Sequence, residues 1–260
     1  MINKDSIIKE FKFLYINSNN FETGKNNKIF LYAHKDRVGF NVVGNKDKGL
    51  YIIYKYGNIL EKDISTLDKL FSLKSGIIGI KVVEIYKKYI FIQTDKQLTI
   101  GDFLMFEPNY FIKNGMINGP YLDNLIGNLT IKHILSENRN IGVYQSIDEE
   151  SQLLYSNFPK KIEKNIILDV LWQDYLQEEI DLDIIYNIVG TGYKKLNILN
   201  FEGVKNINLD IPFKIESDFI ENGEIFYIMC PIISGHSSIS SVKIDTLLNF
   251  IKTINSLIKN

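Results

Sequence analysis

The sequence changes character at Gly119-Pro120-Tyr121-Leu122-Asp123-Asn124-Leu125-Ile126-Gly127, where a turn signal precedes one acid and a helical pattern. A β-rich run lies before this stretch. After it, the apolar spacing from Leu125 to Ile134 predicts a helix that leads into a strand near Ile141. An acid held between a turn and a buried helix is well placed to serve a site. Asp123 is therefore the first candidate functional residue.

The composition is that of a soluble globular protein of one or two domains. The 260 residues are 45% hydrophobic and 23% charged, with a formal net charge of -1. No basic stripe is present for nucleic acid, and no run approaches the ~20 apolar residues of a membrane span, so neither partner is expected. Residues 1–11 lack a signal-peptide layout, and the single Cys230 excludes an internal disulfide. We expect a cytoplasmic protein.

Two outer segments of the chain, residues 1–41 and 119–260, indicate one α/β domain. Apolar spacing predicts an opening helix over 4–16 and a closing helix over 241–258, and residues 28–33 form a nearly continuous apolar run typical of a buried strand. Further strands are expected at 141–146, 165–170, 184–189 and 225–230.

Residues 42–118 have a different pattern, with short apolar runs separated by glycines. The expected strands are 50–56, 77–85, 89–93 and 103–106, with at most one helix, over 64–71. This pattern predicts a small β-barrel or sandwich inserted into the α/β domain. We expect its strand 50–56 not to pair with the strand at 28–33.

Histidines and acids stand where the expected strands of the α/β domain end. The residues in such positions are His34, Asp36, Asp123, Glu149, Glu150, Asp169 and His236. In open α/β sheets, ligands bind outside the carboxyl ends of the strands. We therefore expect these side chains to converge on one site, although His34 and His236 are far apart in the sequence.

Mixed imidazole and carboxylate ligands suit two divalent metal ions, such as zinc, cobalt or manganese. A carboxylate can bridge ions about 3.5–4 Å apart, and Asp123 is the bridging candidate. The pair Glu149-Glu150 suits a divided role, in which one acid binds metal and its neighbour takes a proton. Each motif alone also has a structural interpretation: a strand-end hydrogen bond for His34, a helix cap for Asp169, and a solvated pair for Glu149-Glu150.

The order of these motifs resembles that of the tetrahedral aminopeptidases, the glutamyl and deblocking aminopeptidases with two metal ions. The matching segments are Ala33-His34-Lys35-Asp36-Arg37-Val38-Gly39-Phe40, Ile100-Gly101-Asp102-Phe103-Leu104-Met105-Phe106-Glu107-Pro108 and Gly115-Met116-Ile117-Asn118-Gly119-Pro120-Tyr121-Leu122-Asp123, followed by Glu149-Glu150, Asp169 and His236-Ser237. The resemblance implies a mixed-sheet, three-layer metallopeptidase domain over 1–41 and 119–260, with a small β-barrel domain inserted over 42–118.

The resemblance also implies a role for each site residue. The metal ligands would be His34, Asp123 as the bridge, Glu150, Asp169 and His236. Glu149 would be the general base, and Asp36 would orient the His34 ring. The implied reaction is hydrolysis of N-terminal peptide bonds by a metal-activated water, with zinc as the first choice of metal. The implied partners are a peptide substrate and further copies of the chain in a homo-oligomer.

The sequence departs from the family pattern at three places. Asn124-Leu125 replaces the usual Asp-Arg after the bridging acid, Ser151-Gln152-Leu153 lacks the usual glycine, and no Gly-Thr-Asp segment occurs between Asp169 and His236. Two alternatives therefore stay open. One is a non-catalytic relative that acts as a binding or assembly module, and the other is an amidase or deacylase that acts on a non-peptide substrate.

Overall fold

The computed structural model describes residues 4–17, 28–47, 49–59, 61–137, 140–146, 162–173, 179–209 and 216–259. In one group, the elements are α1 (Lys4–Asn17), β1 (Ile29–His34), β9 (Phe111–Lys113), β10 (Met116–Gly119), α3 (Leu122–Glu137), β11 (Gly142–Ser146), β12 (Lys164–Leu171), β13 (Ile185–Thr191), β14 (Val204–Leu209), α4 (Glu216–Phe219), β15 (Glu224–Pro231), β16 (Ser240–Lys243) and α5 (Ile244–Lys259). The other group comprises β2 (Gly39–Asp47), β3 (Leu50–Tyr56), α2 (Glu61–Ser65), β4 (Lys69–Ser72), β5 (Gly76–Gly79), β6 (Lys81–Tyr86), β7 (Tyr89–Gln93) and β8 (Phe103–Leu104).

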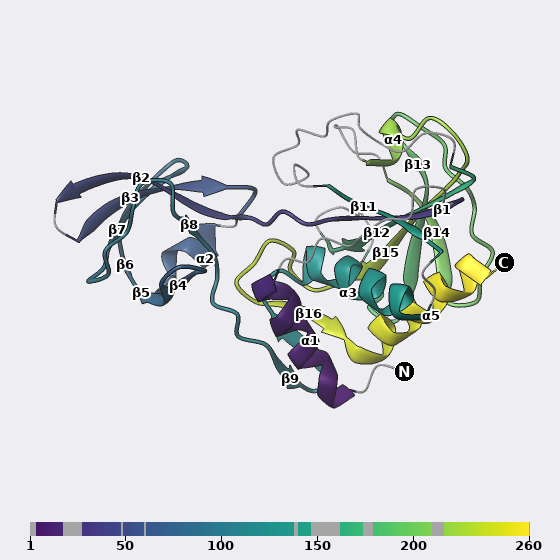
Figure 1. Ribbon diagram of the computed structural model, residues 1–260, viewed down its shortest axis with the longest axis horizontal. Helices are drawn as coiled ribbons and strands as arrows, with labels where there is room; N and C mark the ends of the chain where they lie inside the picture. Colours follow the sequence, from purple (N-terminus) through teal and green to yellow (C-terminus); the bar gives the residue numbers. More distant parts are fainter. Residues whose placement is uncertain are drawn as a thin grey trace.

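These two groups form two lobes (Figure 1). The smaller lobe lies at one end of the molecule, and the chain enters it between β1 and β2 and leaves it between β8 and β9. The larger lobe contains both termini of the described chain. Among the described residues, no helix combines the length and the apolar character that a membrane crossing would require.

A six-stranded mixed sheet is the centre of the larger lobe, with the strand order β11-β1-β12-β15-β13-β14. Strand β1 pairs in parallel with β11 and β12, and β12 pairs in parallel with β15, whereas β13 runs antiparallel to β15. The central strands are buried along nearly their whole length, which explains their continuous apolar runs. The mixed α/β fold predicted from the sequence is confirmed.

Helix α3 packs directly on the sheet, against β1 and β12. A Cβ added at Gly127 would lie 3.0 Å from both the Ala33 Cβ and the Leu168 carbonyl oxygen, so glycine permits the close approach of helix and strands. Helices α1 and α5 contact α3 in turn. The predicted helix after Asp123 is confirmed, and its position sets Asp123 above the ends of β1 and β12.

The predicted closing helix is correct except at its start. Residues Ser240–Lys243 form strand β16, which pairs antiparallel with β10, and α5 begins at Ile244. The error has a physical reason, because burial in this segment alternates with period two and a helix would not give that pattern. The rest of α5 buries Leu247, Ile254 and other residues three or four positions apart, as expected of an amphipathic helix.

The smaller lobe has a five-stranded antiparallel sheet in the order β6-β7-β3-β2-β8, and a two-stranded sheet, β4-β5. Strand β3 pairs with β2 and β7 and not with β1, as the sequence predicted. The predicted helix over 64–71 is wrong. Only Glu61–Ser65 is helical, and Lys69–Ser72 is a strand whose alternate side chains, Leu70 and Ser72, are buried.

Cys230 provides a test of the central sheet. Its thiol lies in β15 with no exposed surface, and burial raises its pKa above the usual range. Because the thiolate is the reactive form, we expect a disulfide reagent at pH 8 to label the folded protein at least about 10³-fold more slowly than the protein unfolded in guanidinium. As the chain has one cysteine, the absorbance of the released thiol reports Cys230 alone. Rapid labelling of the folded protein would contradict the buried position.

Candidate metal centre

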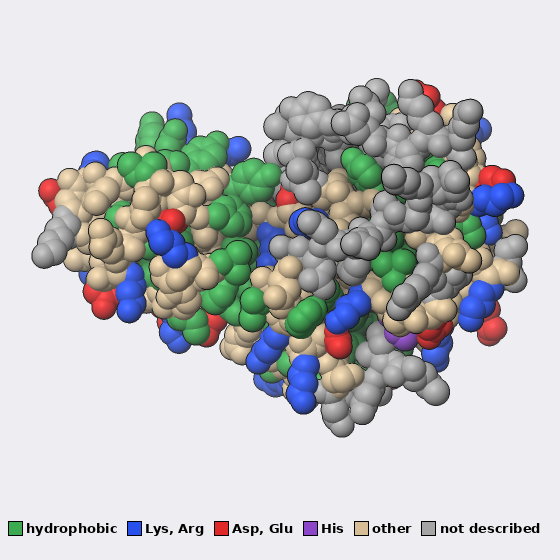
Figure 2. Space-filling view, in the orientation of Figure 1, with side chains coloured by type: hydrophobic (Ala, Val, Ile, Leu, Met, Phe, Trp, Pro, Cys, Tyr) green, Lys and Arg blue, Asp and Glu red, His purple; other side chains and the backbone are tan. Residues whose placement is uncertain are grey.

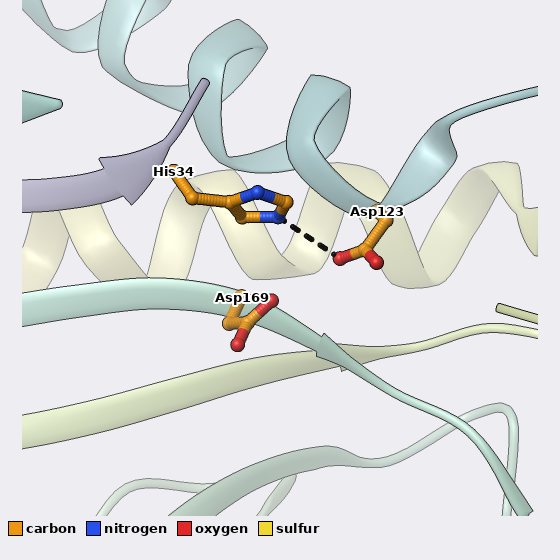
Figure 3. Close-up of side chains that lie close together, drawn as sticks. All are labelled: His34, Asp123 and Asp169. Carbon is orange, nitrogen blue, oxygen red and sulfur yellow. Dashed lines mark hydrogen bonds and ion pairs between the residues drawn. The ribbon is translucent and has the colours of Figure 1, made fainter. Parts of the chain in front are cut away.

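Three of the predicted ligands meet near the carboxyl ends of strands β1 and β12. His34 ends β1, Asp123 lies in the first turn of α3, and Asp169 lies in β12 (Figure 3). Each offers one ligand atom, and these atoms lie within 4.8 Å of one another. The parallel pairing of β1 with β12 brings together two residues that are 135 positions apart, as the sequence positions 34 and 169 indicate.

His236 approaches the same carboxylate from the other side. The His236 Nε2 lies 3.1 Å from Asp123 Oδ2, and the His34 Nε2 lies 3.2 Å from Asp123 Oδ1. In a tetrahedral zinc site with bonds of about 2.0–2.1 Å, two ligand atoms lie about 3.3 Å apart. The donor set therefore fits a metal centre in spacing and in chemistry, and each Asp123 oxygen faces a different imidazole.

Asp123 is anionic in this setting even though it is buried. Burial by itself raises the pKa of its carboxyl, but the charge of the His34 ring and hydrogen bonds from both imidazoles outweigh that effect and hold the pKa well below its usual range. The side chains of His34 and Asp123 are only 3% and 9% exposed. A deprotonated, water-shielded carboxylate is the form that can bind a cation.

Further contacts fix the His34 ring and backbone. Asp36 Oδ1 lies 3.6 Å from His34 Nδ1, on the side of the ring opposite to the Asp123 contact. Asn128 of α3 donates a hydrogen bond from Nδ2 to the His34 carbonyl oxygen at 2.9 Å, and Gln145 of β11 donates to Asn128 Oδ1 at 2.5 Å. A carboxylate near the second ring nitrogen is typical of a ligating histidine, and Asp36 lies at ion-pair distance from that atom.

Asp169 is oriented by a residue that the sequence did not indicate. Tyr227 of β15 donates its hydroxyl hydrogen to Asp169 Oδ2 at 2.6 Å, and the Val170 amide donates to Asp169 Oδ1 at 2.8 Å. Tyr227 lies within a continuous apolar strand, so its pattern indicated burial alone. Only the pairing of β12 with β15 gives it a partner at the site.

The predicted pair Glu149 and Glu150 lies outside the described residues. Their roles as base and metal ligand stay predictions. Of the remaining predicted residues, the structure brings His34, Asp36, Asp123, Asp169 and His236 together.

A cavity of about 360 Å³ borders Ser234 and Gly235 of the loop that carries His236. It is lined by Gly235 of this loop, by Trp172, whose ring contacts that of His236, and by Lys62 of the smaller lobe. Glu179 and apolar side chains that include Ile180 complete the lining. A larger cavity of about 500 Å³ lies near α1 and contacts the centre through Asp36 alone. The smaller cavity borders the loop that carries His236, and the larger one borders the residues that follow His34.

The sequence matches no protein-family profile and no curated protein. Solved structures do match the fold. The dodecamer of PhTET1-12s has a TM-score of 0.72 at 14% identity, covering 98% of this chain and 92% of that chain. Aminopeptidase APDkam598 from the archaeon Desulfurococcus kamchatkensis has a TM-score of 0.70 at 13% identity, covering 98% and 89%.

A third match is the TET aminopeptidase of a marine-sediment Thaumarchaeota archaeon, with a TM-score of 0.68 at 13% identity, covering 92% of this chain and 83% of that chain. These identities are too low to carry an activity across. The agreement extends over nearly the whole of each chain, and so the fold of this protein is that of the TET aminopeptidases.

Proposed function

We propose that this protein is an aminopeptidase that hydrolyses N-terminal peptide bonds with the help of two divalent metal ions, of which zinc is the first choice. The observation that carries the proposal is the Asp123 carboxylate, whose two oxygens face His34 and His236 at 3.2 and 3.1 Å. Asp169 adds a further carboxylate close to His34 and Asp123. The fold shared with solved aminopeptidases supports the reaction class.

The residues of the chain have distinct parts in this proposal. His34, Asp123, Glu150, Asp169 and His236 would hold the ions, which supply Lewis acidity and a water of lowered pKa when bound. Glu149 would accept the proton of the attacking water and return it to the leaving amine. Asp36 would keep the His34 ring in orientation.

The cavity beside His236 is the proposed site for the substrate's first side chain. Its volume of about 360 Å³ is within the roughly 300–1,000 Å³ of small-ligand sites. Trp172 and Ile180 offer apolar contact, and Lys62 and Glu179 place both signs of charge at its walls.

We also propose that the smaller lobe, from β2 to β8, is the inserted β-barrel domain and that copies of the chain assemble through it. The smaller lobe carries a set of exposed large apolar side chains, and Figure 2 shows apolar side chains gathered over this lobe. The residues are Val43, Leu73, Ile77, Val83, Tyr86, Tyr89 and Ile100. Such a surface is typical of a protein contact. PhTET1-12s, which shares the fold, is a dodecamer.

The proposal is tested by removing and restoring metal. We expect chelator-treated protein to be inactive on aminoacyl p-nitroanilides and to regain activity with Zn²⁺, Co²⁺ or Mn²⁺. The N-acetylated form of the same substrate is the matched control and should resist cleavage. Cleavage of acyl amides alone would indicate an amidase, and a metal-loaded protein inert toward both would favour a binding module.

A further inference from the structure

A contact from the smaller lobe reaches the loop that carries His236. Asp63 lies in α2, and its Oδ1 accepts hydrogen bonds from Ser237 Oγ at 3.3 Å and Ser238 Oγ at 3.2 Å. These serines follow His236 directly in the sequence but are 174 and 175 positions from Asp63. One carboxylate of the smaller lobe thus binds the two residues that follow a candidate metal ligand of the larger lobe.

The same loop packs against the side chain of Trp172. The Trp172 and His236 rings lie 5.1 Å apart between centroids, with an interplanar angle of 54°. A Cβ at Gly235 would lie 2.4 Å from the Trp172 ring, so the loop backbone is in close contact with the indole. Trp172 follows β12, the strand that carries Asp169. The loop therefore contacts both Trp172, directly after β12, and Asp63 of the smaller lobe.

The backbone of the loop needs such support. Ser234 and His236 have φ values of 57° and 52°, in the left-handed region that residues with a Cβ rarely adopt. A conformation of this kind persists only where the surrounding contacts enforce it. Because His236 is itself one of these residues, release of the loop would change the direction of its imidazole.

The environment of Asp63 is unlike that of a solvated surface acid. Its Oδ2 is buried, and among the described residues no hydrogen-bond partner for this atom is present. Both hydroxyl contacts are made to Oδ1. All of the hydrogen bonds that the structure shows for this carboxylate therefore go to the loop that carries His236.

We propose that Asp63 is a positioning residue, which holds the loop 234–238 so that the His236 Nε2 is directed at Asp123 Oδ2. The placement of the smaller lobe thereby sets the geometry of one ligand in the larger lobe. The consequence for metal binding rests on the proposed function, whereas the consequence for the His236 ring does not.

The first test uses metal-free protein and the nitrogen chemical shifts of the histidine rings. The chain has three histidines, so His133→Gln and His236→Asn assign the signals. Asp63→Ala should shift the His236 signals, because the ring loses its fixed contact with Asp123. Asp63→Asn retains an oxygen acceptor at Oδ1 and should resemble the parent. Glu61→Gln, an exposed acid in the same helix, is the matched control and should also leave the signals unchanged.

The second test measures Zn²⁺ affinity by competition with a chromophoric chelator. Loss of a residue that orients a ligand typically weakens metal binding 10–100-fold, and we expect at least about tenfold for Asp63→Ala. Asp63→Asn should bind within about threefold of the parent, since a neutral acceptor forms a weaker but similar hydrogen bond. If Asp63→Ala does not fold, the Ser237→Ala/Ser238→Ala variant removes the same contacts from the other side.

The outcomes distinguish the positioning role of Asp63 from the proposed metal-dependent function. A folded Asp63→Ala protein with parental His236 signals, or with parental Zn²⁺ affinity, would overturn the positioning role, even if its melting temperature fell. A parent protein that binds no Zn²⁺ would overturn the proposed function instead, and the ring signals alone would then decide the role of Asp63.

Discussion

The Asp123→Asn variant is expected to lose metal binding and peptide hydrolysis together. Asparagine has the shape of aspartate but no charge, and its amide nitrogen would face one of the two imidazoles that now contact carboxylate oxygens. The asparagine side chain has one acceptor oxygen, so it can face one of the two imidazoles with an acceptor but not both. We expect Zn²⁺ affinity to fall by more than about 10²-fold, beyond the range seen when only an orienting partner is lost.

The measurement is metal content and affinity for the purified variant beside the parent, with hydrolysis of an aminoacyl p-nitroanilide. Asp183→Asn is a matched control, because it makes the same change at an acid whose side chain is 67% exposed. The loss of a hydrogen bond to a charged group should also destabilise metal-free Asp123→Asn by about 1.5–3 kcal/mol. If Asp123→Asn kept both ions at parental affinity, the bridging role would be wrong.

Glu149→Gln is expected to lower the turnover rate by about 10²–10⁴ while both ions stay bound. By the family resemblance, Glu149 neighbours a ligand without being one, so the amide removes only the group that accepts the proton of water. Glu150→Gln should differ, with weaker metal binding as well as lower turnover, because a neutral amide is a poorer ligand for a divalent cation.

Metal analysis and steady-state rates distinguish these two variants. The decisive comparison is the rate at full metal loading, where Glu150→Gln should recover in part and Glu149→Gln should not recover. Parental hydrolysis by Glu149→Gln would rule out its assignment as the base. Equal loss of metal from both variants would mean that Glu149 is itself a ligand.

The strands that hold the site could be predicted because they are buried on both faces. The apolar runs before His34 and around Asp169 mark β1 and β12. Because parallel strands have their carboxyl ends at the same side of the sheet, residues near those ends are expected to lie close together. Edge elements were harder to predict. Strand β16 directly precedes α5 and contains one apolar residue, Val242, so its pairing with β10 is what distinguishes strand from helix there.

Residues that act on the site through others could not be found from local sequence. Tyr227 lies in the apolar run that follows Glu224 in β15, and Asp63 is an acid in a five-residue helix. Their roles depend on tertiary contacts at separations of 58 and 174 positions, which no periodic pattern encodes. The sequence therefore predicted the residues around the proposed ions better than the residues that position them.

The position of β1 between β11 and β12 has a consequence for biosynthesis. Its partner β12 begins at Lys164, which leaves the ribosome 130 residues after His34. At roughly 5–20 residues per second, the first strand waits about 6–26 seconds for this neighbour. The five-stranded sheet of the smaller lobe is complete by Leu104, so that lobe can fold while the nascent chain still holds β1 unpaired. A chaperone that binds apolar nascent segments would therefore find Phe30 and Leu31 without a strand partner until β11 is synthesised, although both are buried in the finished protein.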